Sequence, residues 1–197
     1  MTDEELFEFY KSQYEREDDA RNDINDRLQI PLAIIVSLIG VLATMVKLLG
    51  YPCFTLKFGV FSLLIIASGI FVARALFFFV RAWRGYEYEF LPTADQTRGY
   101  REKLKATYAQ YSNSQQLVEQ YTKQYIQDYY ISCSSKNTGN NDTRALNLHF
   151  SNRAIIFAAV FVASTYVFYE CFKLSDLIPS ESASVHITQP VEVKRAP

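Results

Sequence analysis

The residues capable of nucleophilic or metal chemistry are few and widely separated. The 197-residue chain has three cysteines, Cys53, Cys133 and Cys171, and two histidines, His149 and His186. Metal centres and catalytic triads need several such groups at matched positions, and these five form no recognisable set of either kind. The 7 glycines form no phosphate-binding loop. The sequence therefore predicts no enzyme, no cofactor and no metal site.

Three apolar stretches, residues 28–49, 58–80 and 154–172, stand out from an otherwise polar chain. A transmembrane helix needs roughly 20 mostly apolar residues, and each stretch reaches about that length. A buried core helix is the alternative for each, but three of them would leave too little polar sequence to cover them. The first 27 residues are acidic, unlike a cleaved signal peptide. We therefore expect three transmembrane helices, the first with Pro31 in its opening turn, where proline is tolerated.

The link between the first two spans, residues 50–57, is short and contains glycine and proline. Such a link predicts a tight turn, so residues 28–80 should form an antiparallel hairpin. The expected fold is an all-α membrane protein with three transmembrane helices, a hairpin plus one, and cytoplasmic amphipathic helices.

Positive residues predict the orientation of these spans, because lysine and arginine are enriched on the cytoplasmic side. Nine of them flank the two ends of the hairpin: Arg16, Arg21, Arg27, Arg81, Arg84, Arg98, Arg101, Lys103 and Lys105. We therefore expect the amino-terminal helix 1–27 and the helical region 81–153 in the cytoplasm. The third span, 154–173, would return through the membrane and leave an extended or disordered tail, 174–197, on the outer side.

This topology places Cys53 and Cys171 on the same, outer side of the membrane. In an oxidising periplasm they could form a disulfide, and two isolated thiols are the alternative. Cys133 would lie in the reducing cytoplasm and stay free.

Arg74 lies within the second apolar stretch, seven residues before Arg81. One interpretation is that its side chain extends along the helix to the cytoplasmic headgroups. The other is that it faces the interior of a helix bundle, where it would set ion preference or hold a closed state.

Small residues four apart mark candidate packing faces, because they let helix backbones approach closely. The pairs are Gly40 with Thr44, Gly69 with Ala73, Ala154 with Ala158, and Ala159 with Ala163. These faces would pack the three spans together or join copies of the chain into a homo-oligomer.

The polar regions predict further helices. Thr2 and Glu5 have the spacing of a capping box at the start of helix 1–27. After a break at Pro92 and Thr93, a stripe at helical spacing predicts one amphipathic helix, or two joined near 112–116. Its members are Tyr100, Leu104, Tyr108, Tyr111, Val118, Tyr121, Tyr125 and Tyr129. We interpret this stripe either as packing against helix 1–27 or as a surface for a protein partner.

The segment 132–144, "SCSSKNTGNNDTR", contains Gly139 and paired asparagines. Such a composition is typical of a loop or a weakened helix, here joining the cytoplasmic helix to the third span.

Three segments of the chain together resemble a known family: "YEREDDARNDINDRLQIPLAIIVSLIG", "YEYEFLPTADQTRGYREKL" and "NTGNNDTRALNLHFSNRAIIFAAVF". They are similar to small multi-pass membrane effectors of bacterial anti-phage systems, most of all the transmembrane effector of a retron. The resemblance implies an abortive-infection effector that is held quiet by a complex of reverse transcriptase and RNA-linked DNA and damages the inner membrane once released. The chain itself has no recognisable nucleic-acid module. The alternative is a non-conducting membrane scaffold or accessory subunit that docks a cytoplasmic partner.

Overall fold

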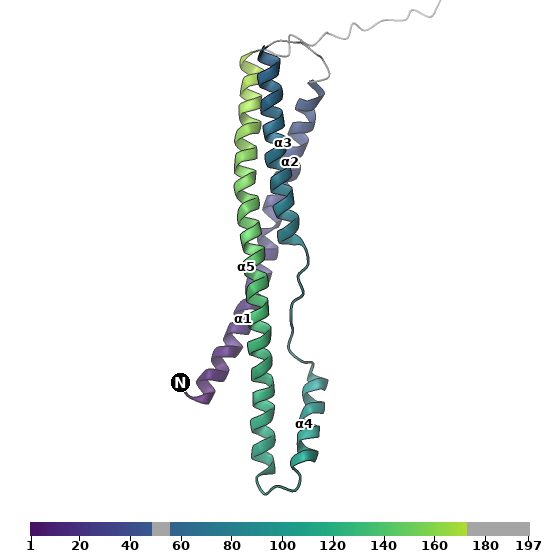
Figure 1. Cartoon of the computed structure of the whole chain (residues 1–197), viewed down its shortest axis with the longest axis vertical. Helices are drawn as coiled ribbons and strands as arrows, with labels where there is room; N and C mark the ends of the chain where they lie inside the picture. The colour runs from purple at the N-terminus through teal and green to yellow at the C-terminus, as the bar shows by residue number, and fades with distance from the viewer. Residues whose placement is uncertain (49–55, 173–197) are drawn as a thin grey trace, which may run out of the picture.

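The computed structural model describes residues 1–48 and 56–172, of which 88% are helical, with no strand among them. Five helices follow one another along the chain (Figure 1): α1 (Asp3–Arg27), α2 (Gln29–Leu48), α3 (Leu56–Trp83), α4 (Ala94–Tyr108) and α5 (Ser114–Cys171). The helical fold class expected from the sequence is therefore confirmed.

The molecule is long and narrow because α5, with 58 residues, runs along its whole length (Figure 1). In what we call the apolar half, α2, α3 and residues 148–171 of α5 pack side by side. In the polar half, α1 and α4 flank residues 114–147 of α5, and the irregular linker 84–93 connects α3 to α4. Within the described residues, three helical runs are long and apolar enough to cross a membrane: Asp3–Lys47, Leu56–Trp83 and Ser114–Cys171.

Buried residues recur at alternating steps of three and four along the helices of the apolar half. On α3 the buried set is Phe61, Ile65, Ser68, Val72, Ala75, Phe79 and Ala82, and on α5 it includes Arg144, Leu148, Ser151, Ile155, Ala158, Val162 and Thr165. A mean step of 3.5 residues keeps one seam facing a neighbouring helix over many turns. The same period extends into the polar half through Asn137 and Asn141.

Small side chains bring α3 and α5 close together. Ser68, Ala75, Ser151 and Ala158 are all fully buried, and the Ser151 hydroxyl donates a hydrogen bond to the carbonyl of Ala75 at 3.0 Å. Of the candidate packing pairs, Ala154 and Ala158 lie on this seam. The others face outward: Thr44, Ala73, Ala159 and Ala163 are exposed, and a Cβ added at Gly40 or Gly69 would meet nothing within 4 Å.

The junction between α1 and α2 lies at Leu28, whose N–H bonds to the carbonyls of Asn25 and Asp26 instead of continuing the helical pattern. Pro31 explains the break. It has no N–H to donate to the carbonyl of Arg27, four residues earlier, and its ring crowds that carbonyl.

The expected starts of the polar helices are confirmed. Thr2 and Glu5 form a reciprocal capping box at α1, and Thr93 and Gln96 form another at α4. The tyrosine-rich region is two helices, since α4 ends at Tyr108 and α5 begins at Ser114. The turn expected at 50–57 falls mostly outside the described residues, as does the tail 174–197.

Of the two alternatives for residues 132–144, a loop or a weakened helix, the loop is wrong, because this whole segment lies inside the unbroken α5. Gly139 faces the surface, while Asn137 and Asn141 are buried and bond to other segments. These tertiary hydrogen bonds outweigh the weak helix propensity of glycine and asparagine.

Ala158 and Ala159 offer a matched test of the seam between α3 and α5. Ala158→Phe should lower the stability of the detergent-solubilised protein by about 1–3 kcal/mol, because the ring has no space at a fully buried position. Ala159→Phe adds the same ring to an exposed position and should change little. Denaturant titration followed by helical circular dichroism measures both, and equal effects would contradict the seam.

Candidate functional site at the Arg144 cluster

The polar and apolar halves meet at Arg144 of α5, a guanidinium only 4% exposed. Its Nε donates to the carbonyl of Ala82 at 3.0 Å, its Nη1 to the Tyr88 hydroxyl at 2.9 Å, and its Nη2 to Oδ1 of Asn25 at 2.6 Å. One side chain therefore connects α5 to the end of α3, to the linker and to α1. We call Glu17, Asn25, Ala82, Tyr88, Asn141 and Arg144 the Arg144 cluster.

The Ala82 carbonyl gives this buried charge its first compensation. Ala82 lies in the last turn of α3, where backbone carbonyls lack helical partners and carry the negative end of the helix dipole. Within the described part of the chain, no carboxylate forms an ion pair directly with Arg144. The guanidinium is thus held by neutral acceptors and by a helix end.

The nearest charge compensation through hydrogen bonds runs to Glu17, which is also buried. The Tyr88 hydroxyl donates to Oδ1 of Asn141 at 2.7 Å, and Asn141 Nδ2 donates to the Glu17 carbonyl at 2.8 Å and to its Oε2 at 3.0 Å. Tyr88 and Asn141 thus link a cation to an anion, and each bond polarises the next. Every buried side-chain nitrogen or oxygen in the described residues has a hydrogen-bond partner.

A second set of contacts clamps the linker 84–93 onto α5. Asn137 Oδ1 accepts from the Glu89 N–H at 3.0 Å, while its Nδ2 donates to the Glu89 carbonyl at 2.9 Å. Asn140 donates to the carbonyl of Glu87 at 2.8 Å. The linker is an extended segment whose backbone groups need partners, and α5 supplies them from side chains.

The Glu89 side chain strengthens this clamp through its carboxylate. Lys136 donates to it at 3.1 Å and Ser132 donates to it at 3.1 Å. These hydrogen bonds, the one from Lys136 first, hold the pKa of Glu89 below its ordinary value. On α1, the guanidinium carbon of Arg21 lies 5.4 and 5.5 Å from the ring centres of Tyr88 and Phe90. The linker therefore has contacts with both α5 and α1.

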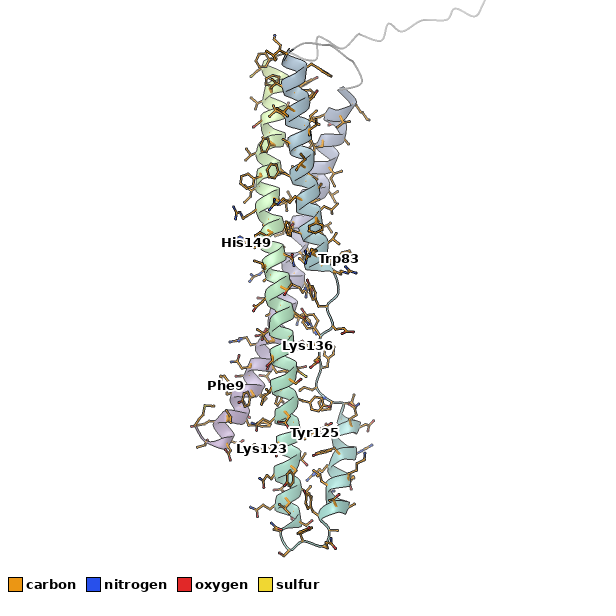
Figure 2. The ribbon with its side chains drawn as sticks, viewed as in Figure 1. Phe9, Trp83, Lys123, Tyr125, Lys136 and His149 are labelled. Atoms are coloured by element: carbon orange, nitrogen blue, oxygen red, sulfur yellow. The ribbon has the colours of Figure 1, made fainter. Side chains whose placement is uncertain are left out.

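The tyrosine stripe lies between α4 and α5, as Figure 2 shows around Tyr125. Tyr100 stacks on Tyr125 with ring centroids 4.1 Å apart, and Tyr108 stacks on Tyr121 at 5.4 Å. Tyr111 contacts Tyr108, and Leu104 is half-buried.

Most of the stripe therefore packs on itself, rather than against the amino-terminal helix. The aromatic contact with α1 is made by Tyr130, which meets Phe7 and Tyr14. A partner surface on the remaining exposed edge stays a prediction.

Arg74 is exposed on the outer face of α3, and its guanidinium lies 5.5 Å from the centre of the Phe78 ring. Phe78 is one turn nearer the carboxyl end of α3, the direction in which the side chain must extend to reach the polar half. Within this chain Arg74 does not face the bundle interior, which was the second of its two interpretations.

The cysteines and histidines stay apart in the described structure. Cys171 is exposed at the end of α5, and Cys53 lies outside the described residues, so their disulfide stays a prediction. Cys133 is buried in the polar half, where burial, and then the charge of Glu89, raise the pKa of its thiol. Among the residues that the structure describes, no three His, Cys, Asp or Glu side chains could share a metal ion.

The Arg144 cluster was missed at the level of sequence, although a signal for it exists. Asn137, Asn141 and Arg144 continue the three-four spacing of Leu148, Ser151 and Ile155 without interruption. Polar residues in register with an apolar seam indicate buried hydrogen bonding. The glycine and asparagine content was interpreted instead as a sign of a loop or a weakened helix.

The cluster can be tested by removing a single oxygen atom, the hydroxyl of Tyr88. Tyr88→Phe should lower the free energy of unfolding by about 1–3 kcal/mol, because it removes one hydrogen-bond partner from each of the buried residues Arg144 and Asn141. Tyr86 is the matched control, since its hydroxyl makes a single exposed bond to the Arg81 carbonyl. Thermal unfolding in detergent compares the two, and a Tyr88→Phe variant as stable as Tyr86→Phe would contradict the cluster.

The lowered pKa of Glu89 predicts that the clamp between the linker and α5 weakens in acid. Because its pKa is lowered in the folded protein, its contribution is complete above the ordinary value, roughly pH 4, and is lost as the pH falls through the lowered value. The stability difference between wild type and Glu89→Gln should therefore be constant near neutral pH and shrink in acid. Glu87→Gln serves as the control, and a difference that grows in acid would contradict the assignment.

Comparison with known proteins adds no relative: no protein family, curated protein or solved structure matches this chain. The resemblance to retron effectors therefore stays a prediction from the sequence.

Proposed function

We propose that the chain is an inner-membrane effector of a retron-like, abortive-infection system, which permeabilises the membrane when a cytoplasmic sensor complex releases it. The anti-phage setting, the bacterial inner membrane and the sensor complex of reverse transcriptase and RNA-linked DNA come from the resemblance in the sequence. The continuous helix α5, which joins the polar half to the apolar half, supports a coupling between a sensor region and the membrane.

The observation that carries this proposal is the continuity of α5. The same helix pairs with α4 through the tyrosine stripe, bears Arg144 and then forms the third apolar run. A partner that shifts the α4–α5 hairpin would therefore move an apolar helix with it, because no flexible segment separates the two regions.

The described form fits the quiet state of such an effector. Its seam between α3 and α5 is closely packed by small side chains, as expected of a closed arrangement. Permeabilisation then requires several copies or a rearranged bundle. The outward small residues Gly40, Gly69 and Ala73 lie where a second copy could pack closely.

The Arg144 cluster is the restraint in this proposal. It fixes α1, the end of α3 and the linker to α5 at the level where the apolar half begins. Release would replace these hydrogen bonds with hydrogen bonds to water or to other chains. Until then, the cluster holds the spans in the described arrangement.

The second candidate is a non-conducting scaffold or accessory subunit. The polar half favours this function, because its buried polar side chains all have hydrogen-bond partners and it could dock a partner as it stands. Membrane permeability separates the two functions.

Arg144→Met should release the restraint. We expect wild type, produced with the proposed sensor complex in a bacterial host, to leave the membrane potential intact until the trigger is supplied. Arg144→Met should depolarise the membrane without the trigger, whereas the exposed Arg153→Met should behave like wild type. A potential-sensitive dye and propidium uptake report the effect, with membrane abundance checked by immunoblot. Intact potential in every variant and condition would support the scaffold.

A further inference from the structure

A cleft of about 540 Å³ lies between the α1–α2 junction and α5. It is lined by Ile24, Arg27, Ile30, Pro31, Ile34, Ala145, Leu148, His149, Asn152, Ile155 and Ile156. We propose that this cleft binds one anionic phospholipid, with its phosphate at Arg27 and Asn152 and an acyl chain along the isoleucines. The proposal requires only that the apolar runs span a membrane, so it does not depend on the effector function.

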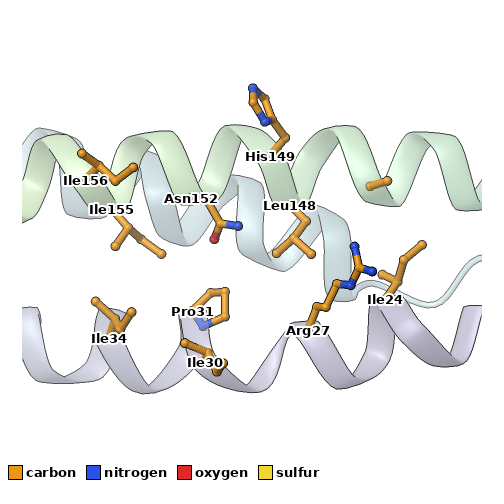
Figure 3. A pocket seen from close by; sticks show the side chains of 11 residues that line it. Ile24, Arg27, Ile30, Pro31, Ile34, Leu148, His149, Asn152, Ile155 and Ile156 are labelled. Atoms are coloured by element: carbon orange, nitrogen blue, oxygen red, sulfur yellow. The ribbon is translucent and has the colours of Figure 1, made fainter. Parts of the chain in front are cut away.

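The cleft exists because the helix breaks at Leu28. Pro31 bends the path of α1 and α2 at this point, and Pro31 itself faces Asn152 of α5 across the gap (Figure 3). Its volume falls within the range of about 300–1,000 Å³ that is usual for small-molecule sites.

The lining divides into two ends along the bundle. Figure 3 shows Ile34, Ile155 and Ile156 at one end and Arg27 with Ile24 at the other, with Pro31 and Asn152 between them. The isoleucine end continues into the apolar half, while Arg27 is the last residue of the polar α1. An amphiphile with an apolar tail and a polar head matches this division, whereas a free anion would leave the isoleucine end unfilled.

The level of the cleft also matches a lipid headgroup. Figure 2 places Trp83, the last residue of α3, close to the level of His149, and tryptophan is enriched at membrane interfaces. Ile30 and Ile156 are 69% and 62% exposed, so the acyl end opens to the surroundings of the bundle.

The charge at the polar end favours an anion. Arg27 offers a planar set of donors that suits phosphate, and the Asn152 amide adds a donor. Arg27 also pairs with Asp23 at 3.6 Å, but both side chains are largely exposed. Exposed pairs contribute little, so a phosphate in the cleft can compete with Asp23. His149 points away from the gap in Figure 3 and is not assigned to the headgroup.

Native mass spectrometry of the full chain in detergent can test the site. The probes are phosphatidylglycerol and phosphatidylcholine with identical acyl chains, added together at equal concentration. We expect wild type to retain phosphatidylglycerol about fivefold better, the preference that one arginine near an anionic headgroup gives. Arg27→Gln should bring the ratio close to one, whereas Arg81→Gln, at the end of α3 and outside the cleft, should keep it.

A second pair of variants addresses the acyl end. Ile34→Trp fills the cleft and should reduce retention of both lipids at least threefold, whereas Ile39→Trp, exposed on α2 outside the cleft, should not. Helical circular dichroism confirms that each variant is folded. Equal retention of the two lipids by wild type, an equal loss of preference in Arg81→Gln, or undiminished retention by Ile34→Trp would each overturn the proposal.

Discussion

The rest of this structure depends on one buried guanidinium, that of Arg144. Leaving such a charge without partners in a low-dielectric interior would cost far more than a typical hydrogen bond returns. Arg144 avoids that cost only if α1, the end of α3 and the linker arrive together, because each supplies one acceptor. The position of three separate segments along α5 is therefore decided largely by one side chain.

The buried positions along α5 keep the same spacing of three and four residues in both halves, but their side chains differ in chemistry. In the apolar half its buried positions hold small and aliphatic side chains, which pack by shape. In the polar half the same positions hold Asn137, Asn141 and Arg144, which pack by hydrogen bonding. Shape alone tolerates sliding between neighbouring registers, whereas directional bonds do not. The polar half thus fixes the register of the whole bundle.

The positions of most helices can be predicted from the sequence, because the length and hydropathy of an apolar run and the identity of capping residues are local properties. The three apolar runs, the capping box of α1 and the break before α4 were predicted on those grounds. The continuous α5 and the Arg144 cluster were not. Residues 132–144 have poor helix propensity, and only partners more than forty residues away compensate for it. Likewise, the outward position of Arg74 depends on the seam that α3 presents to α5, which small-residue pairs alone did not identify.

The length of α5 has a mechanical consequence. At 1.5 Å per residue its 58 residues extend roughly 85 Å, and a bilayer core accounts for about 30 Å of that. Residues 114–143, which precede Arg144, account for roughly 45 Å of this length, so about half of α5 lies on the polar side of the Arg144 cluster. A tilt of about ten degrees of this part of α5 about Arg144 would displace its far end by about 8 Å. A molecule bound at the distant tyrosine-lined end would therefore act on the apolar half through a long lever arm.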